Sequence, residues 1–181
     1  MPQTNKNDDS RAKNIAREIL GYVIAILSAV IVAVLIRIFI FEPFIVPTPS
    51  MEPTLMVGDK VIINKLAYRF GPVKNGDIVA FHSVTEGEKE LVKRAIAVEG
   101  DTIVLTSEGE VFVNGEKVNE EYLPPGQDIS YLNQEVTVGA DQIFVMGDNR
   151  NNSFDSRYFG LIPEENIFGE FLIVYWPPSR W

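Results

Sequence analysis

The hydrophobic pattern divides the chain into one long apolar segment near its start and a series of short apolar runs after it. The first segment covers residues 19–41 and is interrupted only by Arg37. With a rise of about 1.5 Å per residue, roughly 20 apolar residues cross the hydrocarbon core of a bilayer as a helix. We therefore predict a transmembrane helix over residues 19–41.

A cleaved signal peptide is the alternative interpretation of this segment, because four basic residues precede it. Such a peptide has an apolar region of about 7–15 residues that is followed by small residues at a cleavage site. Here the run is longer and continues into the bulky sequence FIFEPF at 39–44. An uncleaved signal anchor fits better, with Arg37 extending its side chain to the headgroups.

The flanking charges predict the orientation of this helix. Residues 1–18 carry a net charge of +1, whereas residues 42–181 hold 11 basic and 22 acidic residues, a net charge of −11. Because Lys and Arg concentrate on the cytoplasmic side of a span, we predict a cytoplasmic tail over 1–18 and an extracytoplasmic domain over 42–181. Either a plasma membrane or a thylakoid-type membrane is compatible with this arrangement.

The composition of the domain excludes several classes of function. A net charge of −11 argues against nucleic-acid binding, which needs a basic surface. The chain has no cysteine, so it has no disulfide and no cysteine-based metal site. The acidic residues Glu116, Glu120 and Glu121 are interpreted as solvated surface.

The remaining pattern predicts a mostly β domain. Short runs rich in β-branched and aromatic residues recur between turn residues, as is typical of strands. Asn114-Gly115 lies between the run 111–113 and Lys117-Val118 and favours a two-residue hairpin. We expect an antiparallel β-sheet or partial barrel that follows one N-terminal transmembrane helix. The apolar runs are residues 61–63, 78–81, 103–105, 111–113, 136–138, 143–146 and 171–175.

Ser50 is the first candidate for chemistry. Three prolines within 47–53 restrict the backbone around it, and it follows the apolar segment by nine residues. A serine nucleophile needs a base, which is most often histidine, but lysine is a known alternative. His82 is the only histidine, while Lys65 and Lys93 lie between apolar runs where burial would favour a neutral amine. The residues by themselves leave these three bases open.

The segment 146–160 is a third candidate because it is rich in short polar side chains, which brace loops by bonding to the backbone. Asp148 and Asp155 also suggest a calcium loop. That pattern needs Asp or Asn at its third position and Gly at its sixth, where this chain has Arg150 and Ser153. We therefore predict no metal site and no cofactor.

Five segments together resemble the bacterial type I signal peptidases, or leader peptidases, in their short single-span form. They are TPSMEPTL at 48–55, GDKVIINK at 58–65, GDIVAF at 76–81, VKRAIAVEGD at 92–101 and GDNRNNSFDSRYFG at 147–160. The resemblance implies a membrane-anchored serine endopeptidase with a Ser–Lys dyad. Its substrates would be exported preproteins, whose signal peptides it removes through an acyl-enzyme after small residues, as in Ala-X-Ala.

The resemblance also implies roles for individual residues. Ser50 would be the nucleophile and Lys93 the general base, in preference to Lys65. The oxyanion would be held by the Ser50 N–H and the hydroxyl of Thr48, where many family members have serine. Membrane lipid and the secretion translocon are further expected partners.

Supporting roles follow from the same resemblance. Ser153 would hydrogen-bond and orient the lysine, Asp155 would pair with Arg157, and Asp148 would brace Arg94. Four apolar residues would line the pockets that select small side chains, although ordinary core packing is the alternative for each of them. These four are Phe44, Val46, Leu91 and Val92.

The C-terminal segment and the function each have more than one interpretation. The apolar segment 171–181 either touches the bilayer, since Trp and Tyr favour membrane interfaces, or forms a final core strand. Rival functions are a self-cleaving repressor, which would need a DNA-binding domain, and a silent membrane scaffold, which would lack Ser50 or Lys93. A hydrolase that uses His82 is a third rival.

Overall fold

The computed structural model describes residues 6–85, 87, 89–126 and 129–180, with side chains from residue 14 onward. These residues form two units, one that ends at Ile40 and one that begins at Phe41.

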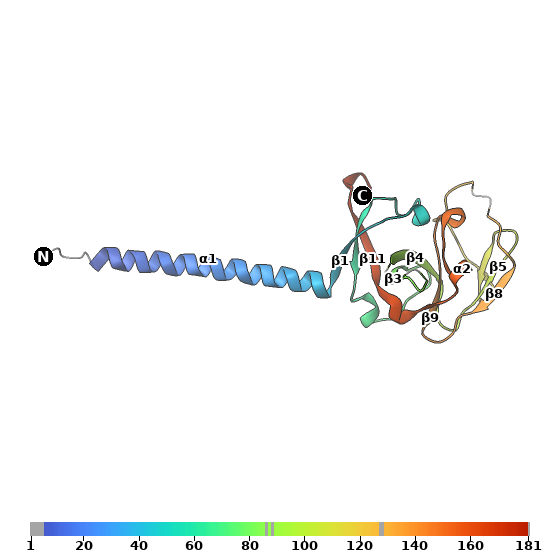
Figure 1. The fold of residues 1–181 in the computed structure, drawn as a ribbon, viewed down its shortest axis with the longest axis horizontal. Coiled ribbons are helices and arrows are strands. Elements are labelled where there is room, and N and C mark those ends of the chain that lie inside the picture. The colour runs from blue at the N-terminus through green and yellow to red at the C-terminus, as the bar shows by residue number, and fades with distance from the viewer. Residues whose placement is uncertain (1–5, 86, 88, 127–128, 181) are drawn as a thin grey trace. The chain divides into compact units, whose positions relative to one another are not determined.

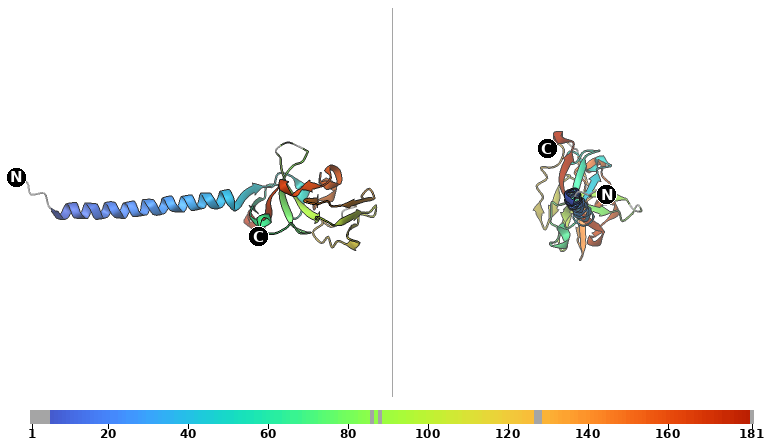
Figure 2. Two further views of the ribbon diagram at one scale, coloured as in Figure 1. Left: turned by 90° about the horizontal axis from the view of Figure 1, so that it is seen from below. Right: turned by 90° about the vertical axis from the view of Figure 1, so that its left-hand side faces the viewer.

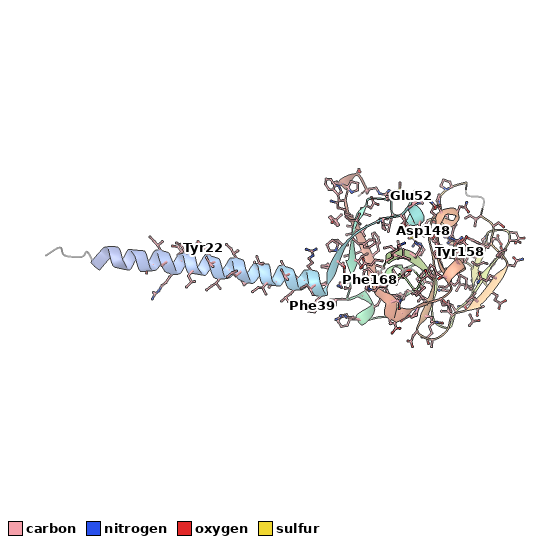
Figure 3. All side chains as sticks on the ribbon, in the orientation of Figure 1. Tyr22, Phe39, Glu52, Asp148, Tyr158 and Phe168 are labelled. Atoms are coloured by element: carbon pink, nitrogen blue, oxygen red, sulfur yellow. The ribbon has the colours of Figure 1, made fainter. Side chains whose placement is uncertain are left out.

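The first unit is a single helix, α1 (Lys6–Phe39). Its portion Asn14–Phe39 has a mean hydropathy of 3.0 and is long enough to cross a membrane. Its apolar side chains are exposed, and Tyr22 and Phe39 project outward from the helix (Figure 3). The helix ends two residues before the predicted end, because Phe41 starts a strand and pairs with Asn64.

Most strands of the second unit belong to one antiparallel sheet in the order β1-β2-β11-β3-β4-β9-β10 (Figure 1). The long strand β11 pairs first with β3 and then with β2, and its register with β2 shifts at two places. Such bulges bend a strand and increase its twist, so the sheet curls. The strands are β1 (Phe41–Ile45), β2 (Lys60–Asn64), β3 (Ile78–His82), β4 (Glu90–Ala97), β9 (Gln142–Met146), β10 (Ile162–Pro163) and β11 (Ile167–Trp176).

A smaller antiparallel sheet has the order β7-β6-β5-β8 and lies on the side of the domain away from β1 (Figures 1 and 2). Asn114 and Gly115 both have positive φ, as a two-residue hairpin turn requires, and they join β6 to β7 as predicted. The fold is therefore mostly β, as the sequence predicts. The strands are β5 (Thr102–Leu105), β6 (Val111–Val113), β7 (Glu116–Lys117) and β8 (Gln134–Thr137).

Short helical turns complete the domain. The turn η1 (Pro49–Met51) carries Ser50, and η3 (Arg150–Asn152) with α2 (Ser156–Phe159) lies in the polar segment that the sequence singled out. The others are η2 (Ala67–Arg69), η4 (Glu164–Asn166) and η5 (Pro178–Arg180).

The core anchors the loop that carries Ser50. Met51 and Leu55 are almost completely buried, and they pack with Val61 and Ile63 of β2 in one apolar cluster. Burial of one such side chain stabilises a fold by about 1.5–3 kcal/mol. The backbone around Ser50 is therefore held by apolar packing as well as by its prolines.

Candidate active site

The loop that carries Ser50, residues 46–59, is clamped from one side by Asn149. The Asn149 backbone N–H donates to the Ser50 carbonyl at 3.0 Å, and its side-chain amide donates to the Pro49 carbonyl at 3.1 Å. The Thr48 hydroxyl lies 3.1 Å from Ser50 Oγ. Ser50 is only 6% exposed and lines a cleft.

Lys93 reaches Ser50 from β4. Its Nζ lies 2.7 Å from Ser50 Oγ and donates a second hydrogen bond to the Val92 carbonyl at 3.2 Å. The side chain is only 2% exposed, although lysine is seldom buried. The fold therefore brings together the serine and the lysine that the sequence selected.

Burial changes the protonation of this lysine. Desolvation disfavours the ammonium form and lowers the pKa of Lys93 to about 8, although Asp155 and Asp148 act in the opposite direction. At pH 7 about one such lysine in ten is neutral, against fewer than about one in a thousand for a lysine in water. The site therefore makes a neutral amine available near physiological pH.

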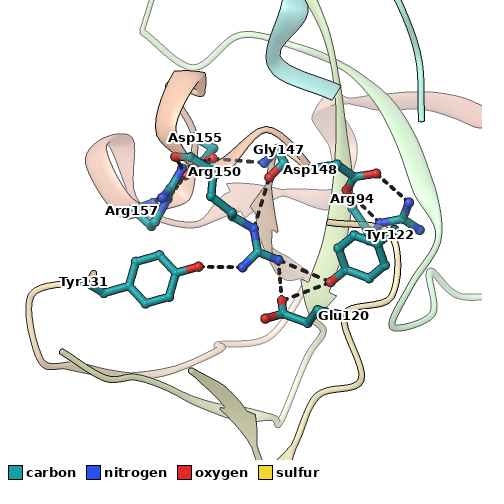
Figure 4. Close-up of polar contacts among 9 residues, drawn as sticks. All are labelled: Arg94, Glu120, Tyr122, Tyr131, Gly147, Asp148, Arg150, Asp155 and Arg157. Atoms are coloured by element: carbon teal, nitrogen blue, oxygen red, sulfur yellow. Dashed lines mark hydrogen bonds and ion pairs between the residues drawn. The ribbon is translucent and has the colours of Figure 1, made fainter. Parts of the chain in front are cut away.

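Asp148 binds Arg94, the residue that follows Lys93 (Figure 4). The Arg94 guanidinium donates from Nε at 2.9 Å and from Nη2 at 2.7 Å, one bond to each oxygen of the fully buried carboxylate. Thr54 Oγ1 also donates to Asp148 at 2.5 Å. Because Arg94 adjoins Lys93 and Thr54 belongs to the loop of Ser50, this carboxylate connects both sides of the site.

Asp155 forms the second expected pair, with Arg157. The Arg157 guanidinium donates from Nε at 2.7 Å and from Nη2 at 2.8 Å, and the Gly147 N–H donates to the same carboxylate at 2.9 Å. Bidentate pairs of this kind fix geometry as well as charge. Asp155 therefore closes residues 147–157 into a rigid loop.

Ser153 departs from the interaction that the resemblance implies. Its Oγ is buried and has no hydrogen-bond partner in the described part of the chain, so it does not bond to Lys93. The reason is that Lys93 Nζ is directed to Ser50 Oγ and the Val92 carbonyl instead. A buried hydroxyl without a partner costs about 1–3 kcal/mol, and such groups call for a functional explanation.

A cleft of about 340 Å³ opens above Ser50 and Lys93. Of the four residues expected in substrate pockets, Leu91 lines this cleft. Val46 and Val92 are 3% and 6% exposed and pack with Phe44 in the core cluster of Met51 and Leu55. For these three residues a contact with substrate stays a prediction.

The alternative bases have other contacts. Lys65 Nζ forms an ion pair with Glu42 at 2.9 Å. His82 ends β3, is exposed, and its ring packs against Phe168 with 4.9 Å between centroids. Neither residue lines the cleft at Ser50.

Comparison with known proteins identifies the family of this chain. Residues 19–176 match the family described as signal peptidase, peptidase S26. The chain belongs to this family. It is 38% identical over 160 residues to signal peptidase I of Leptolyngbya laminosa. This alignment covers 84% of this chain and 77% of the relative.

Two other relatives show similar agreement. Probable signal peptidase I-1 of Synechocystis sp. is 40% identical over 162 residues. This alignment covers 84% of this chain and 80% of the relative. Signal peptidase I P of Bacillus subtilis subsp. natto is 40% identical over 171 residues. This alignment covers 90% of this chain and 91% of the relative. The chain is thus a serine endopeptidase of the signal peptidase I type, its substrates are preprotein signal peptides, and α1 fits a single membrane anchor.

A buried arginine that the sequence did not select supports the loop of this peptidase (Figure 4). Arg150 is 2% exposed and donates to the Gly147 carbonyl at 3.1 Å, to Tyr131 at 2.6 Å, to Tyr122 at 3.2 Å and to Glu120. Burial opposes its charge, but Glu120, Tyr131 and Tyr122 together outweigh burial and raise the pKa of Arg150 above its usual value.

Glu120 corrects the interpretation of the acidic residues as solvated surface. Its side chain is only 11% exposed because it pairs with Arg150. The Arg94 guanidinium lies over the face of the neighbouring Tyr122 ring, with its Cζ 4.0 Å from the ring centroid. Sequence reasoning missed this cluster because its partners are 30 residues apart; the one available signal was a tyrosine among the acidic residues.

Replacement of Gly147 by Ala is expected to disrupt the site. A Cβ at this position would overlap the Ser153 hydroxyl and the Ser50 carbonyl oxygen. We expect a loss of about 1–3 kcal/mol in stability, as for other overpacked cores, together with a strong loss of cleavage. Thermal unfolding and preprotein cleavage measure the two effects. Gly71→Ala is the matched control, since its Cβ would meet nothing within 4 Å; equal effects of the two substitutions would contradict the prediction.

Proposed function

We propose that this chain removes signal peptides from exported preproteins with a Ser50–Lys93 dyad, through an acyl-enzyme, and cuts after small residues of the Ala-X-Ala type. The observation that carries the proposal is the buried contact of 2.7 Å between Lys93 Nζ and Ser50 Oγ. A serine beside a lysine whose pKa is lowered to about 8 has the base that it needs.

In the first half of the reaction, neutral Lys93 accepts the Ser50 proton as Oγ attacks the carbonyl carbon of the scissile bond. The tetrahedral intermediate collapses, the C–N bond breaks, and Lys93 passes the proton to the departing amine. The Thr48 hydroxyl, 3.1 Å from Ser50 Oγ, and the Ser50 N–H stabilise the oxyanion. Loss of one such donor typically costs about 2.7–4 kcal/mol.

In the second half, Lys93 takes a proton from water as the water oxygen attacks the acyl carbon, and it returns this proton to Ser50 Oγ when the bond between the acyl carbon and Oγ breaks. The Ser153 hydroxyl supports a role in this cycle, because it is buried without a hydrogen-bond partner in the described part of the chain and could accept a hydrogen bond from a lysine amine that turns away from Ser50. Ser153 would then orient the amine between the two half-reactions.

An open edge of β4 supports binding of the signal peptide as an added strand. β9 pairs with β4 only from Arg94 onward, so the segment 90–93 has a strand partner, β3, on one side alone within the described chain. Extended peptides bind such edges through main-chain hydrogen bonds, and shallow pockets then select side chains. The nearly buried Val46 and Val92 would leave room only for small ones.

The membrane arrangement belongs to the same proposal. Residues 1–18 lie in the cytoplasm, 19–41 anchor the chain, and 42–181 act outside, where the translocon delivers preproteins. Strand β11 has exposed apolar residues that support contact of the domain with lipid, since aromatic side chains favour membrane interfaces. They are Leu172, Ile173, Tyr175 and Trp176.

Cleavage of a purified preprotein by the full chain in detergent tests the proposal. The wild type should cut after Ala-X-Ala, and substitution of either Ala by a bulky residue should abolish the cut. Ser50→Ala should be inactive, while His82→Ala and Lys65→Ala should remain active. Loss of activity in His82→Ala alone would identify the histidine as the base and overturn the dyad.

The pH dependence follows from the lowered pKa of Lys93. Because the neutral amine is the active form, kcat/KM should rise with pH and level off above an apparent pKa of about 8. This profile is measured as initial rates of preprotein cleavage between about pH 6 and pH 10. A rise that continues to the usual pKa of lysine, near 10.4, would show that Lys93 is not the titrating base.

A further inference from the structure

The cleft at Ser50 has a wall that none of the assigned pocket residues forms. The cleft is lined by residues of the connection between β3 and β4 and of β4 itself, and by Asn152 and Phe154 of the 147–160 loop. Thr48 and Pro49 line it next to Ser50. The question is what the Phe154 side of this cleft receives.

Phe154 is a rigid apolar surface at the rim of the cleft. Its side chain is 53% exposed, yet its neighbours Ser153 and Asp155 are held inside the loop. Its ring stacks on Tyr158 and meets Phe159 edge-on, each at 5.5 Å between centroids. A large exposed ring that is fixed in this way beside a reactive serine has the features of a binding surface.

Phe154 and the residues expected in the pockets for small side chains belong to different segments of the chain. Leu91 lines the cleft, whereas Val92 packs with Phe44 and Val46 in the core cluster on the other side of the strand. Ser50 and Lys93 line the same cleft as Leu91 and Phe154, so the scissile bond would lie in this cleft. If the residues before the cut pair with the open edge of β4 beside Leu91, the Phe154 side of the cleft is left for the chain after the cut.

We propose that Phe154, supported by Tyr158, binds an apolar side chain in the first residues of the mature protein, the segment that follows the cut. This proposal rests on the proposed function, because it takes the small-residue pockets to hold the segment before the cut. Phe154 thereby adds a preference on the leaving side of the bond. An apolar side chain gains by contact with the ring, whereas an acidic one loses hydration there.

Matched peptides test this preference. They share one signal-peptide segment ending in Ala-X-Ala and carry Gly, Leu, Phe or Asp at each of the first three positions after the cut. The full chain in detergent is compared with Phe154→Ala, Phe154→Leu and Phe70→Ala. Phe70 is the control, because this phenylalanine is 86% exposed and does not line the cleft.

We expect the wild type to prefer Leu or Phe over Gly and Asp at one of these positions. Phe154→Ala should lower kcat/KM for that preferred peptide by about tenfold and for the Gly peptide by less than about twofold. Phe154→Leu should restore most of the preference, and Phe70→Ala should leave it unchanged. Hydrolysis of the acyl-enzyme should be unaffected, since the mature segment has already left.

Three results would overturn the proposal: an equal loss on all peptides, a changed preference before the cut, or slower deacylation in Phe154→Ala. Each is distinct from failure of the proposed function. If the proposed function fails, the wild type itself does not cut the peptides, or Ser50→Ala still cuts them.

Discussion

Replacement of Lys93 by Ala is expected to lower kcat by roughly 10⁴–10⁶-fold, and Ser50→Ala by a similar factor. The two groups act as one unit across a contact of 2.7 Å, so removal of either leaves the other without a function. The double variant should therefore be no slower than the single variants. Single-turnover cleavage of a preprotein measures all three.

Two substitutions sharpen this prediction. Lys93→Arg should not restore cleavage, because a guanidinium stays protonated and cannot act as a base. Lys65→Ala is the matched control, since Lys65 pairs with Glu42 and does not line the cleft. A Lys93→Ala variant within tenfold of the wild type, on the order of 1.4 kcal/mol, would contradict the dyad.

Replacement of Glu120 by Ala is expected to destabilise the domain by about 3–5 kcal/mol. It would leave the Arg150 guanidinium buried without its carboxylate, and removal of one partner from a buried ion pair is costly for this reason. Because Arg150 also holds the Gly147 carbonyl, cleavage should fall as well. Chemical or thermal unfolding in detergent measures the loss of stability.

The neighbouring Glu121 provides the control for this change, because it is exposed and Glu121→Ala should alter stability by less than about 0.5 kcal/mol. Glu120→Gln keeps an acceptor for Arg150 but not the charge, so its effect should lie between the two. Equal stability of Glu120→Ala and Glu121→Ala would mean that Arg150 needs no counter-ion.

Local pattern predicted much of this fold. The apolar segment became α1, and the runs at 61–63, 78–81 and 143–146 lie in β2, β3 and β9. Strand β1 was missed because its residues continue the apolar segment, and only pairing with β2 makes it a strand. The sequence also left open whether 171–175 is a core strand; its pairing with both β2 and β3 places β11 inside the sheet.

The site divides in the same way. Ser50, Lys93 and the acidic partners of Arg94 and Arg157 lie in short motifs, so family resemblance selected them. The Arg150–Glu120 pair was missed because nothing in either local sequence points to the other. The implied Ser153–Lys93 bond is absent because the lysine amine has closer partners, which no motif encodes.

The sequence by itself determined the long apolar helix and the strand-rich domain, because these depend on periodicity and composition, and its motifs selected Ser50 and Lys93 as candidates through the family resemblance. Only the tertiary structure decided that Lys93 is buried, that its amine lies 2.7 Å from Ser50 Oγ, and that Phe154 faces the cleft. The reason is physical: desolvation and contact arise between segments far apart in the chain. The pKa of Lys93, and with it the reactivity proposed for Ser50, is therefore a property of the folded domain.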